Sequence, residues 1–207
     1  GRLGTASERD VLACATALVP PKGYATSGDW AELPGDTLKL DFVHGYRAHD
    51  TRDNLHFSAD GSVVYHAAGL GIVLDSDART QRFMHEHTDD VVCLAMHPDR
   101  DIVATGQVGG RICIWRASTN ALLGRIDDAH TGATVTVAFS PDGKRLASVG
   151  LDAMHSLAIH EWENNPQPET KVYLGKKVGA CETGRQRVFV CAWTPVGDRV
   201  VIGGEML

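Results

Sequence analysis

The sequence has few aromatic residues, no long apolar run and no excess of basic charge, and each shortage excludes a class of protein. Aromatic residues make up 6% of the 207 residues while glycine reaches 22, a composition typical of many short strands joined by tight turns. No apolar run approaches the roughly 18 residues that a membrane-spanning helix needs, and no signal peptide is visible. The formal net charge of −6 argues against a general nucleic-acid or anionic-membrane binder, because such a protein needs a basic face to displace counterions. We therefore expect neither nucleic acid nor membrane as a partner.

The motifs of common catalytic and metal sites are missing as well. There are five cysteines without C-x-x-C spacing, and three of them lie in apolar stretches, which indicates small buried side chains in a reducing compartment: Cys14, Cys93, Cys113, Cys181 and Cys191. No G-x-S-x-G, P-loop, H-E-x-x-H or paired-carboxylate pattern is present. His85 and His87 could share one face of a strand, but no third ligand lies at metal-binding spacing. We expect no catalytic residue, no metal, no cofactor and no enzymatic activity.

The sequence does contain an internal repeat. His87 and His130 both begin an H-T-x-x segment and lie 43 residues apart, as do Pro98 and Pro141. A period of about 40–45 residues with four short strands is typical of a β-propeller blade. Before the Asp-Gly-type turn of each unit stands a large apolar residue at an equivalent position, expected to lie between neighbouring blades: Phe57, Met96, Phe139 and Trp193.

These repeats predict an all-β fold, a partial β-propeller with about three and a half atypical four-stranded blades. The expected parts are an N-terminal strand and connecting segment (1–36), a first blade (37–84), two full blades (85–126 and 127–174) and an incomplete blade (175–207). Propellers close with about 4–8 blades, and closure protects their edge strands. We therefore expect the sequence to be an intracellular piece of a longer chain, whose remaining residues complete the propeller.

Two sets of polar residues are candidate sites. Blades of the WD type carry a buried hydrogen-bonded set of His, Ser or Thr, Asp and Trp that fixes their geometry. The second blade offers His87, Thr105 and Trp115, with Gly109 in the place of the Asp, and the third offers His130, Ser148 and Asp152, with His160 in the place of the Trp. We expect a structural role for these residues, not catalysis or metal binding.

The second set is a locally basic stretch, expected to be an inter-blade loop. Five basic residues there oppose a single acidic one, Glu182, and are candidates for contact with an acidic partner: Lys171, Lys176, Lys177, Arg185 and Arg187. The alternative is a solvated loop without a partner.

A longer stretch carries a family resemblance. Leu38 to Arg47, L-K-L-D-F-V-H-G-Y-R, resembles the HELP motif of the echinoderm microtubule-associated protein-like (EMAP-like) family, and A-T-G-Q-V-G from Ala104 is similar to a WD repeat that follows it there. The similarity is closest to the long members, which repeat a double propeller, and covers roughly residues 33–205. In that family the HELP segment is part of the first propeller, which implies that Leu40, Phe42, Val43 and Tyr46 are core residues.

The resemblance implies a scaffold protein that binds tubulin or microtubules and their associated proteins. It implies a location in the cytoplasm and cytoskeleton, with the axoneme of a cilium or flagellum as the more specific option. Because tubulin is acidic and this chain is acidic too, long-range attraction cannot carry the contact, which leaves local basic groups or shape-matched patches. Two alternatives remain: a generic WD-repeat adaptor without tubulin binding, and an enzyme that uses the central channel. The apolar inner-strand sequence from Val91 to Ala95 disfavours the enzyme.

Overall fold

A computed structural model describes residues 22–23, 35 and 37–205 of the chain. Two units are distinguished along the sequence, with the division after Lys39, and the architecture below is that of the second unit. The N-terminal strand expected within the predicted 1–36 segment lies outside the described residues. Within the described ranges, no helix is both long and apolar enough to span a membrane.

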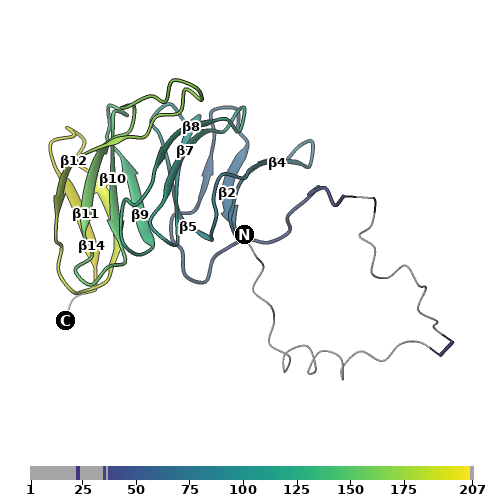
Figure 1. Cartoon of the computed structure of the whole chain (residues 1–207), viewed down its shortest axis with the longest axis horizontal. Helices are drawn as coiled ribbons and strands as arrows, with labels where there is room; N and C mark the ends of the chain where they lie inside the picture. The colour runs from purple at the N-terminus through teal and green to yellow at the C-terminus, as the bar shows by residue number, and fades with distance from the viewer. Residues whose placement is uncertain (1–21, 24–34, 36, 206–207) are drawn as a thin grey trace. The chain divides into compact units, whose positions relative to one another are not determined.

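The chain from Leu55 onward folds into four antiparallel sheets, each built from strands in sequence order. The first sheet contains β1 (Leu55–Phe57), β2 (Val63–Ala67), β3 (Leu70–Asp75) and β4 (Thr80–Met84). The second contains β5 (Val91–Met96), β6 (Ile102–Gln107), β7 (Ile112–Arg116) and β8 (Leu122–Ile126). The third contains β9 (Thr134–Phe139), β10 (Arg145–Gly150), β11 (Leu157–Glu161) and β12 (Lys176–Cys181), and the last β13 (Val188–Trp193) and β14 (Val200–Gly204). The sheets stand face to face in a row (Figure 1), so the all-β, three-and-a-half-blade prediction is confirmed.

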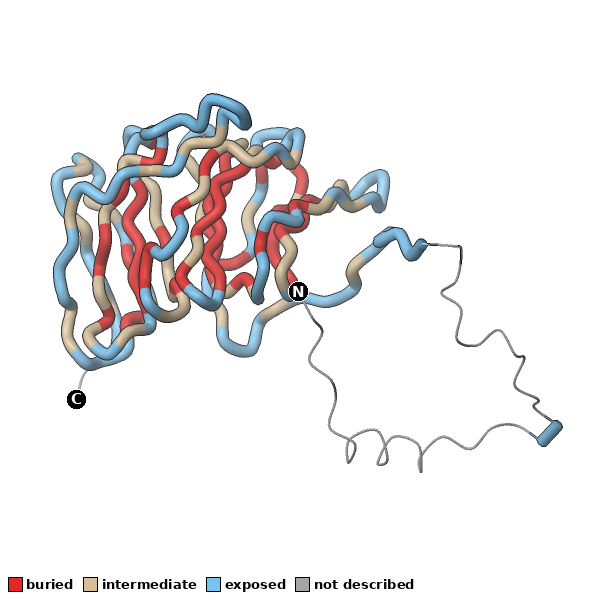
Figure 2. Tube along the Cα trace, in the orientation of Figure 1, coloured by how far each residue is buried: buried red, intermediate tan, exposed pale blue. Residues whose placement is uncertain are grey.

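The core lies between the sheets. Trp115 and Val103 of the second blade pack against Val64 and Val73 of the first, and similar clusters fill the next two gaps. Buried residues therefore run through the middle of the row, as Figure 2 shows. Each blade buries both of its faces only when it has a neighbour on each side. Every blade therefore needs apolar residues at the same positions, which accounts for the regular spacing of the repeat.

The predicted equivalence of the four large residues before the turns is confirmed by the strand register. Each is paired across the hairpin with a matching apolar residue of the next strand: Phe57↔Val63, Met96↔Val103, Phe139↔Leu146 and Trp193↔Val200. Met96, Phe139 and Trp193 pack against the clusters between blades. Phe57 is 55% exposed, because no described blade precedes its own.

The third blade extends further than the sequence suggested. β12 is hydrogen-bonded to β11 as its outermost strand, so the predicted boundary at residue 174 is wrong and residues 176–181 belong to the third blade. The basic stretch is thus partly a strand, not only a loop. Residues 162–175, which precede β12, form a long excursion between the third and the fourth strand. Because the fourth strand therefore comes late in the sequence, the repeat pattern did not reveal it.

The segment from Leu40 to Asp53 contains no strand, although residues 38–43 alternate apolar and polar side chains as a half-buried strand does. Val43 is half-buried and packs against the outer face of the first blade. Its backbone N–H donates to Gln81 Oε1 (2.7 Å) and its carbonyl accepts from Gln81 Nε2 (3.0 Å). A side-chain amide thus replaces a strand partner. Leu40, Phe42 and Tyr46 are exposed at this face, so their expected placement in the core is wrong within the described chain.

Candidate functional site

The second blade carries a continuous hydrogen-bonded set between its loops and its strands. The Thr105 hydroxyl, fully buried on β6, lies 2.7 Å from His87 Nε2 and accepts a bond from Trp115 Nε1 on β7 (3.1 Å). The structure thus brings together the three residues that the sequence singled out in this blade. The bonds tie the connection before β5 to β6 and β7, since their donors and acceptors would otherwise be buried without partners.

A fourth member of this set, Gln107, was not identified from the sequence. Its Oε1 atom lies 2.8 Å from His87 Nδ1 and also accepts from the Thr88 backbone N–H, while its Nε2 donates to Thr88 Oγ1. Because an amide oxygen only accepts, His87 Nδ1 must donate, and Nε2 is left to accept the Thr105 hydroxyl. Gln107 thus fills the role of the missing aspartate from the end of β6. The sequence did contain a signal that another residue takes this role, because Gly109 leaves the turn position of the usual aspartate without a side chain.

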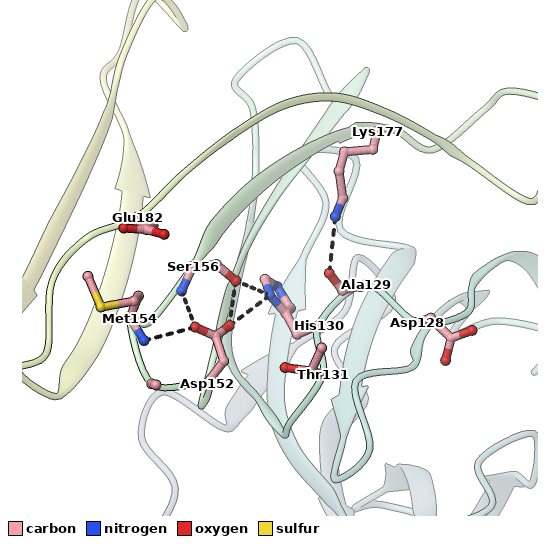
Figure 3. Close-up of a pocket in the computed structure, with 10 residues that line it drawn as sticks. Asp128, Ala129, His130, Thr131, Asp152, Met154, Ser156, Lys177 and Glu182 are labelled. Atoms are coloured by element: carbon pink, nitrogen blue, oxygen red, sulfur yellow. Dashed lines mark hydrogen bonds and ion pairs between the residues drawn. The ribbon is translucent and has the colours of Figure 1, made fainter.

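The third blade has a related set with an extra link, of which Figure 3 draws His130, Ser156 and Asp152. His130 Nε2 lies 2.8 Å from the Ser148 hydroxyl on β10, and His130 Nδ1 lies 3.0 Å from the Ser156 hydroxyl. Ser156 in turn donates to Asp152 Oδ2 (2.5 Å). Asp152 also accepts the backbone N–H groups of Met154 and Ser156. Asp152 therefore reaches His130 by hydrogen bonds through Ser156, and its Oδ2 atom also lies 3.9 Å from His130 Nδ1. Ser156 was not identified from the sequence.

The chain Ser148–His130–Ser156–Asp152 superficially matches a serine nucleophile with its base and orienting groups. Ser148 is 0% exposed and lies on β10, an interior strand of the blade. A nucleophile must reach its substrate, so this hydroxyl cannot attack one. The arrangement fits a group that holds a loop against a sheet.

His160 occupies the position of the third blade that Trp115 occupies in the second. Trp115 pairs with Val103, and His160 pairs with the equivalent Leu146. The imidazole is 1% exposed, and neither of its nitrogens has a hydrogen-bond partner among the described residues. Burial lowers its pKa to about 4, and the pKa of His87 and of His130 is lowered to about 4 by burial as well. All three are neutral at physiological pH, which suits packing and not acid–base catalysis.

A cavity of about 440 Å³ opens beside the third-blade set, as Figure 3 shows. Its wall includes His130, Asp152, Met154 and Glu182, together with Lys177, whose Nζ donates to the Ala129 carbonyl (3.5 Å). Within the described chain no group of three or more His, Cys, Asp or Glu residues is arranged to hold a metal ion. Burial raises the pKa of the Cys93 and Cys191 thiols, which leaves them protonated and unreactive.

The five basic candidates do not form one patch. All five are exposed, and none makes an ion pair with another described residue. Lys176 and Lys177 begin β12, opposite Glu161 and His160, and Lys171 lies shortly before them. Arg185 and Arg187 follow Cys181, at the other end of this strand. The strand extends about 13 Å from Lys177 to Cys181. The structure therefore divides the set into a lysine group and an arginine group.

The comparison with known families matches both parts of this architecture. The HELP motif matches residues 33–72, and the WD domain, G-beta repeat, matches residues 78–116 and 122–154. Echinoderm microtubule-associated protein-like 2 from Rattus norvegicus is 36% identical over 187 residues, which are 83% of this chain and 27% of that protein. Echinoderm microtubule-associated protein-like 1 from the same organism is 31% identical over 185 residues, 83% of this chain and 22% of that protein.

The chain belongs to the EMAP-like family. This EMAP-like chain is also similar to the ciliary WD repeat-containing protein ctxp80 of Euplotoides octocarinatus, at 33% identity over 190 residues, 82% of this chain and 25% of that protein. It spans about a quarter of the length of the curated relatives it matches. The HELP match covers the irregular segment, β1, β2 and the start of β3, and the WD matches cover parts of all three full blades.

Proposed function

We propose that this EMAP-like chain is part of a non-enzymatic scaffold that binds tubulin or microtubules. The single observation that carries the proposal is its 31–36% identity, over about four fifths of its length, to proteins named as microtubule-associated. The fully buried Ser148 and the neutral, buried histidines support a role without catalysis. The structural sets around His87 and His130 serve to hold blade loops in place.

The contact with acidic tubulin is assigned to the lysine group, Lys171, Lys176 and Lys177. These side chains are exposed and free of ion pairs with described residues, so no carboxylate of the described chain competes with an acidic surface. Lys177 Nζ donates one long hydrogen bond, to the Ala129 carbonyl (3.5 Å). Lys176 and Lys177 lie on the outermost strand of the third blade, where a large filament can approach without entering the channel. Arg185 and Arg187 lie beyond the far end of that strand and are assigned no part in this contact.

Co-sedimentation of the full-length protein with microtubules tests this proposal. The triple variant Lys171→Gln, Lys176→Gln, Lys177→Gln is expected to bind about tenfold more weakly, since each exposed charge pair contributes up to about 1 kcal/mol. The matched controls are Arg185→Gln with Arg187→Gln, and Lys144→Gln in the β9–β10 turn, which are expected to bind as the parent does. Equal binding by all variants would remove the lysine assignment. No binding by the parent would favour the generic WD-repeat adaptor.

For the location we propose the cytoskeleton, and the axoneme of cilia or flagella in cells that build them. The similarity to a relative named as ciliary supports this. We also propose that a further part of a longer chain completes the blade that β13 and β14 begin, since that sheet has two strands among the described residues where the others have four. Fluorescent tagging in ciliated cells, with a tubulin co-stain, tests the location; diffuse signal without filaments would oppose it.

A further inference from the structure

A second cavity of about 750 Å³ lies against the inner strands of the blades. Its walls include apolar residues from three of these strands, among them Leu94 of β5, Val137 of β9 and Val190 of β13, together with polar residues such as Thr136 of β9. On one side it is bounded by residues 47–53, the segment that connects the HELP motif to β1. The connection therefore runs along the inner face of the blades and not around their outside.

Residues 47–54 form a loop that is braced by its own side chains. Arg47 Nη2 lies 2.6 Å from Asp50 Oδ2, and the Thr51 hydroxyl donates to the Arg47 carbonyl (2.7 Å). Asn54 is buried, donates to Thr51 Oγ1 (2.5 Å) and accepts a bond from the Tyr46 hydroxyl (2.6 Å). These internal hydrogen bonds and the ion pair keep the loop from extending freely. A displacement at one end of the loop is therefore transmitted to the other end.

Two arginines connect this loop to blades that are distant in sequence. Arg47, whose side chain is 14% exposed, reaches Asp90 in the connection before β5 with an N–O distance of 2.7 Å. The guanidinium carbon of Arg52 lies 4.4 Å from the ring centroid of Phe189 on β13, in cation–π geometry. The loop thus contacts the second and the fourth blade while its own end continues into the first.

We propose that residues 47–53 are an intramolecular strap that ties the first blade to the second and fourth across the inner face of the arc. The strap fixes the curvature of the row of blades, because Arg52 and Phe189 lie 137 positions apart and are separated by two complete blades. The Arg47–Asp50–Asp90 ion pairs hold the loop in the position from which Arg52 reaches Phe189. The HELP-linked segment thus has a structural role within the chain that does not depend on binding to tubulin.

A double-mutant cycle in the full-length protein tests the strap, with hydrogen exchange as the readout. Arg52→Ala and Phe189→Leu are each expected to raise amide exchange about three- to fivefold in residues 47–54 and in β13, in line with a cation–π contact at an exposed site. The double variant is expected to exchange no faster than either single variant, because both remove the same contact. Arg52→Lys keeps a cation and is expected to lie between the parent and Arg52→Ala.

The control is Arg79→Ala, an exposed arginine in the β3–β4 turn, which is expected to leave exchange in both segments unchanged. The strap is overturned if the two single effects add in full, or if Arg52→Ala leaves exchange in β13 at the parent rate. Should Phe189→Leu fail to fold, the comparison of Arg52→Ala with Arg52→Lys still decides, since β13 should exchange faster in Arg52→Ala than in Arg52→Lys, and equal exchange in the two variants would overturn the strap.

Discussion

Two glycines at equivalent turns allow the cost of backbone strain to be compared with the cost of a steric clash. Gly61 (φ +86°) and Gly143 (φ +74°) both follow an Asp in the turn between the first two strands of a blade. A Cβ on Gly61 would meet nothing within 4 Å, whereas a Cβ on Gly143 would lie 1.9 Å from His97 Nε2. His97 is held by Asp99 (Nδ1–Oδ1 2.9 Å) and packs edge-on against Phe139, so it cannot move away easily.

Gly61→Ala is therefore expected to lower the free energy of unfolding by about 1 kcal/mol, from left-handed backbone strain alone. Gly143→Ala is expected to cost at least about 2 kcal/mol more, because the second and third blades must also separate at His97. Denaturant melts of both variants measure the difference. Equal losses would mean that His97 relaxes without cost, and Gly143→Ala with His97→Ala is expected to recover most of the additional loss.

Four of the buried histidines should give the protein an unusual dependence on pH. Burial lowers the pKa of His66, His87, His130 and His160 from the usual 6.5 to about 4. As the pH falls below 6.5 the unfolded chain takes up these protons first, so stability is lost progressively between pH 6.5 and about 4. Aspartates whose pKa is lowered by side-chain hydrogen bonds add a further loss below their usual value of 3.8, in a separate window.

His160→Leu tests this at one residue. The ring nitrogens of His160 have no partner among the described residues, so the substitution is expected to leave stability at pH 7 equal or higher. It should also reduce the slope of stability against pH by up to about 1.4 kcal/mol per unit between pH 6 and 4. The control is exposed His85→Leu. An unchanged slope in His160→Leu would show that this imidazole is not kept neutral by the fold.

At the residue scale, the sequence predicted those members of the hydrogen-bonded sets that lie at repeating positions. It did not reveal the members that lie at other positions. His87, Thr105 and Trp115 stood at positions fixed by the 43-residue period, and the structure joins them by hydrogen bonds. Gln107 and Ser156 were missed because they reach the histidines from positions outside the repeat pattern. Such substitutions depend on which side chain fills a space, and one sequence does not contain that information.

At the scale of elements, the excursion before β12 forms a clasp between the second and third blades. Tyr173 lies beside β8, where its N–H donates to the Leu123 carbonyl (2.9 Å) and its carbonyl accepts from the Arg125 N–H (2.7 Å). Its ring packs edge-on against Trp162, which is buried in the cluster between the two blades. The clasp covers part of the outer edge of the second blade, an edge that would otherwise be open to pairing.

Tyr173→Ala is expected to lower the free energy of unfolding by about 2 kcal/mol, less than a fully buried aromatic, because the ring is only half-buried. It should also speed exchange of the Arg125 amide, whose acceptor lies on the clasp. Tyr173→Phe keeps the ring and serves as the control, with stability expected within about 0.5 kcal/mol of the parent. If Arg125 exchanges at the parent rate in Tyr173→Ala, the backbone alone holds the clasp.

The elements were predicted where apolar alternation, a turn and the repeat agreed, and misplaced where only one of these was present. Residues 38–43 alternate as a strand does, yet Val43 pairs with the Gln81 side chain and not with a strand. β12 has little apolar character in K-K-V-G-A-C and lies 15 residues after β11, so nothing local marked it as the fourth strand. Both misplacements follow from tertiary partners, which override local pattern.

At the scale of the whole molecule, the first and the last sheet of the described chain both expose apolar side chains. Phe57 is 55% exposed on the first blade, and Val190 and Val201 are 51% and 59% exposed on the last sheet. β14 pairs with β13 along one edge, and its other edge has no strand partner within the described part of the chain. A two-stranded sheet with exposed valines is a template for pairing with another chain.

Residues 1–207 expressed alone should therefore self-associate through β14, and the association should persist at high salt because it is apolar. Val201→Lys places a charge on that sheet and is expected to shift the polypeptide toward monomer by at least about tenfold in dissociation constant. The control is Val196→Lys, also exposed but in the turn between β13 and β14, which should leave association unchanged. Sedimentation velocity at several concentrations measures both variants. A monomeric parent with a cooperative melt would contradict this prediction, because it would mean that three and a half blades bury enough surface to stand without a neighbour at either end.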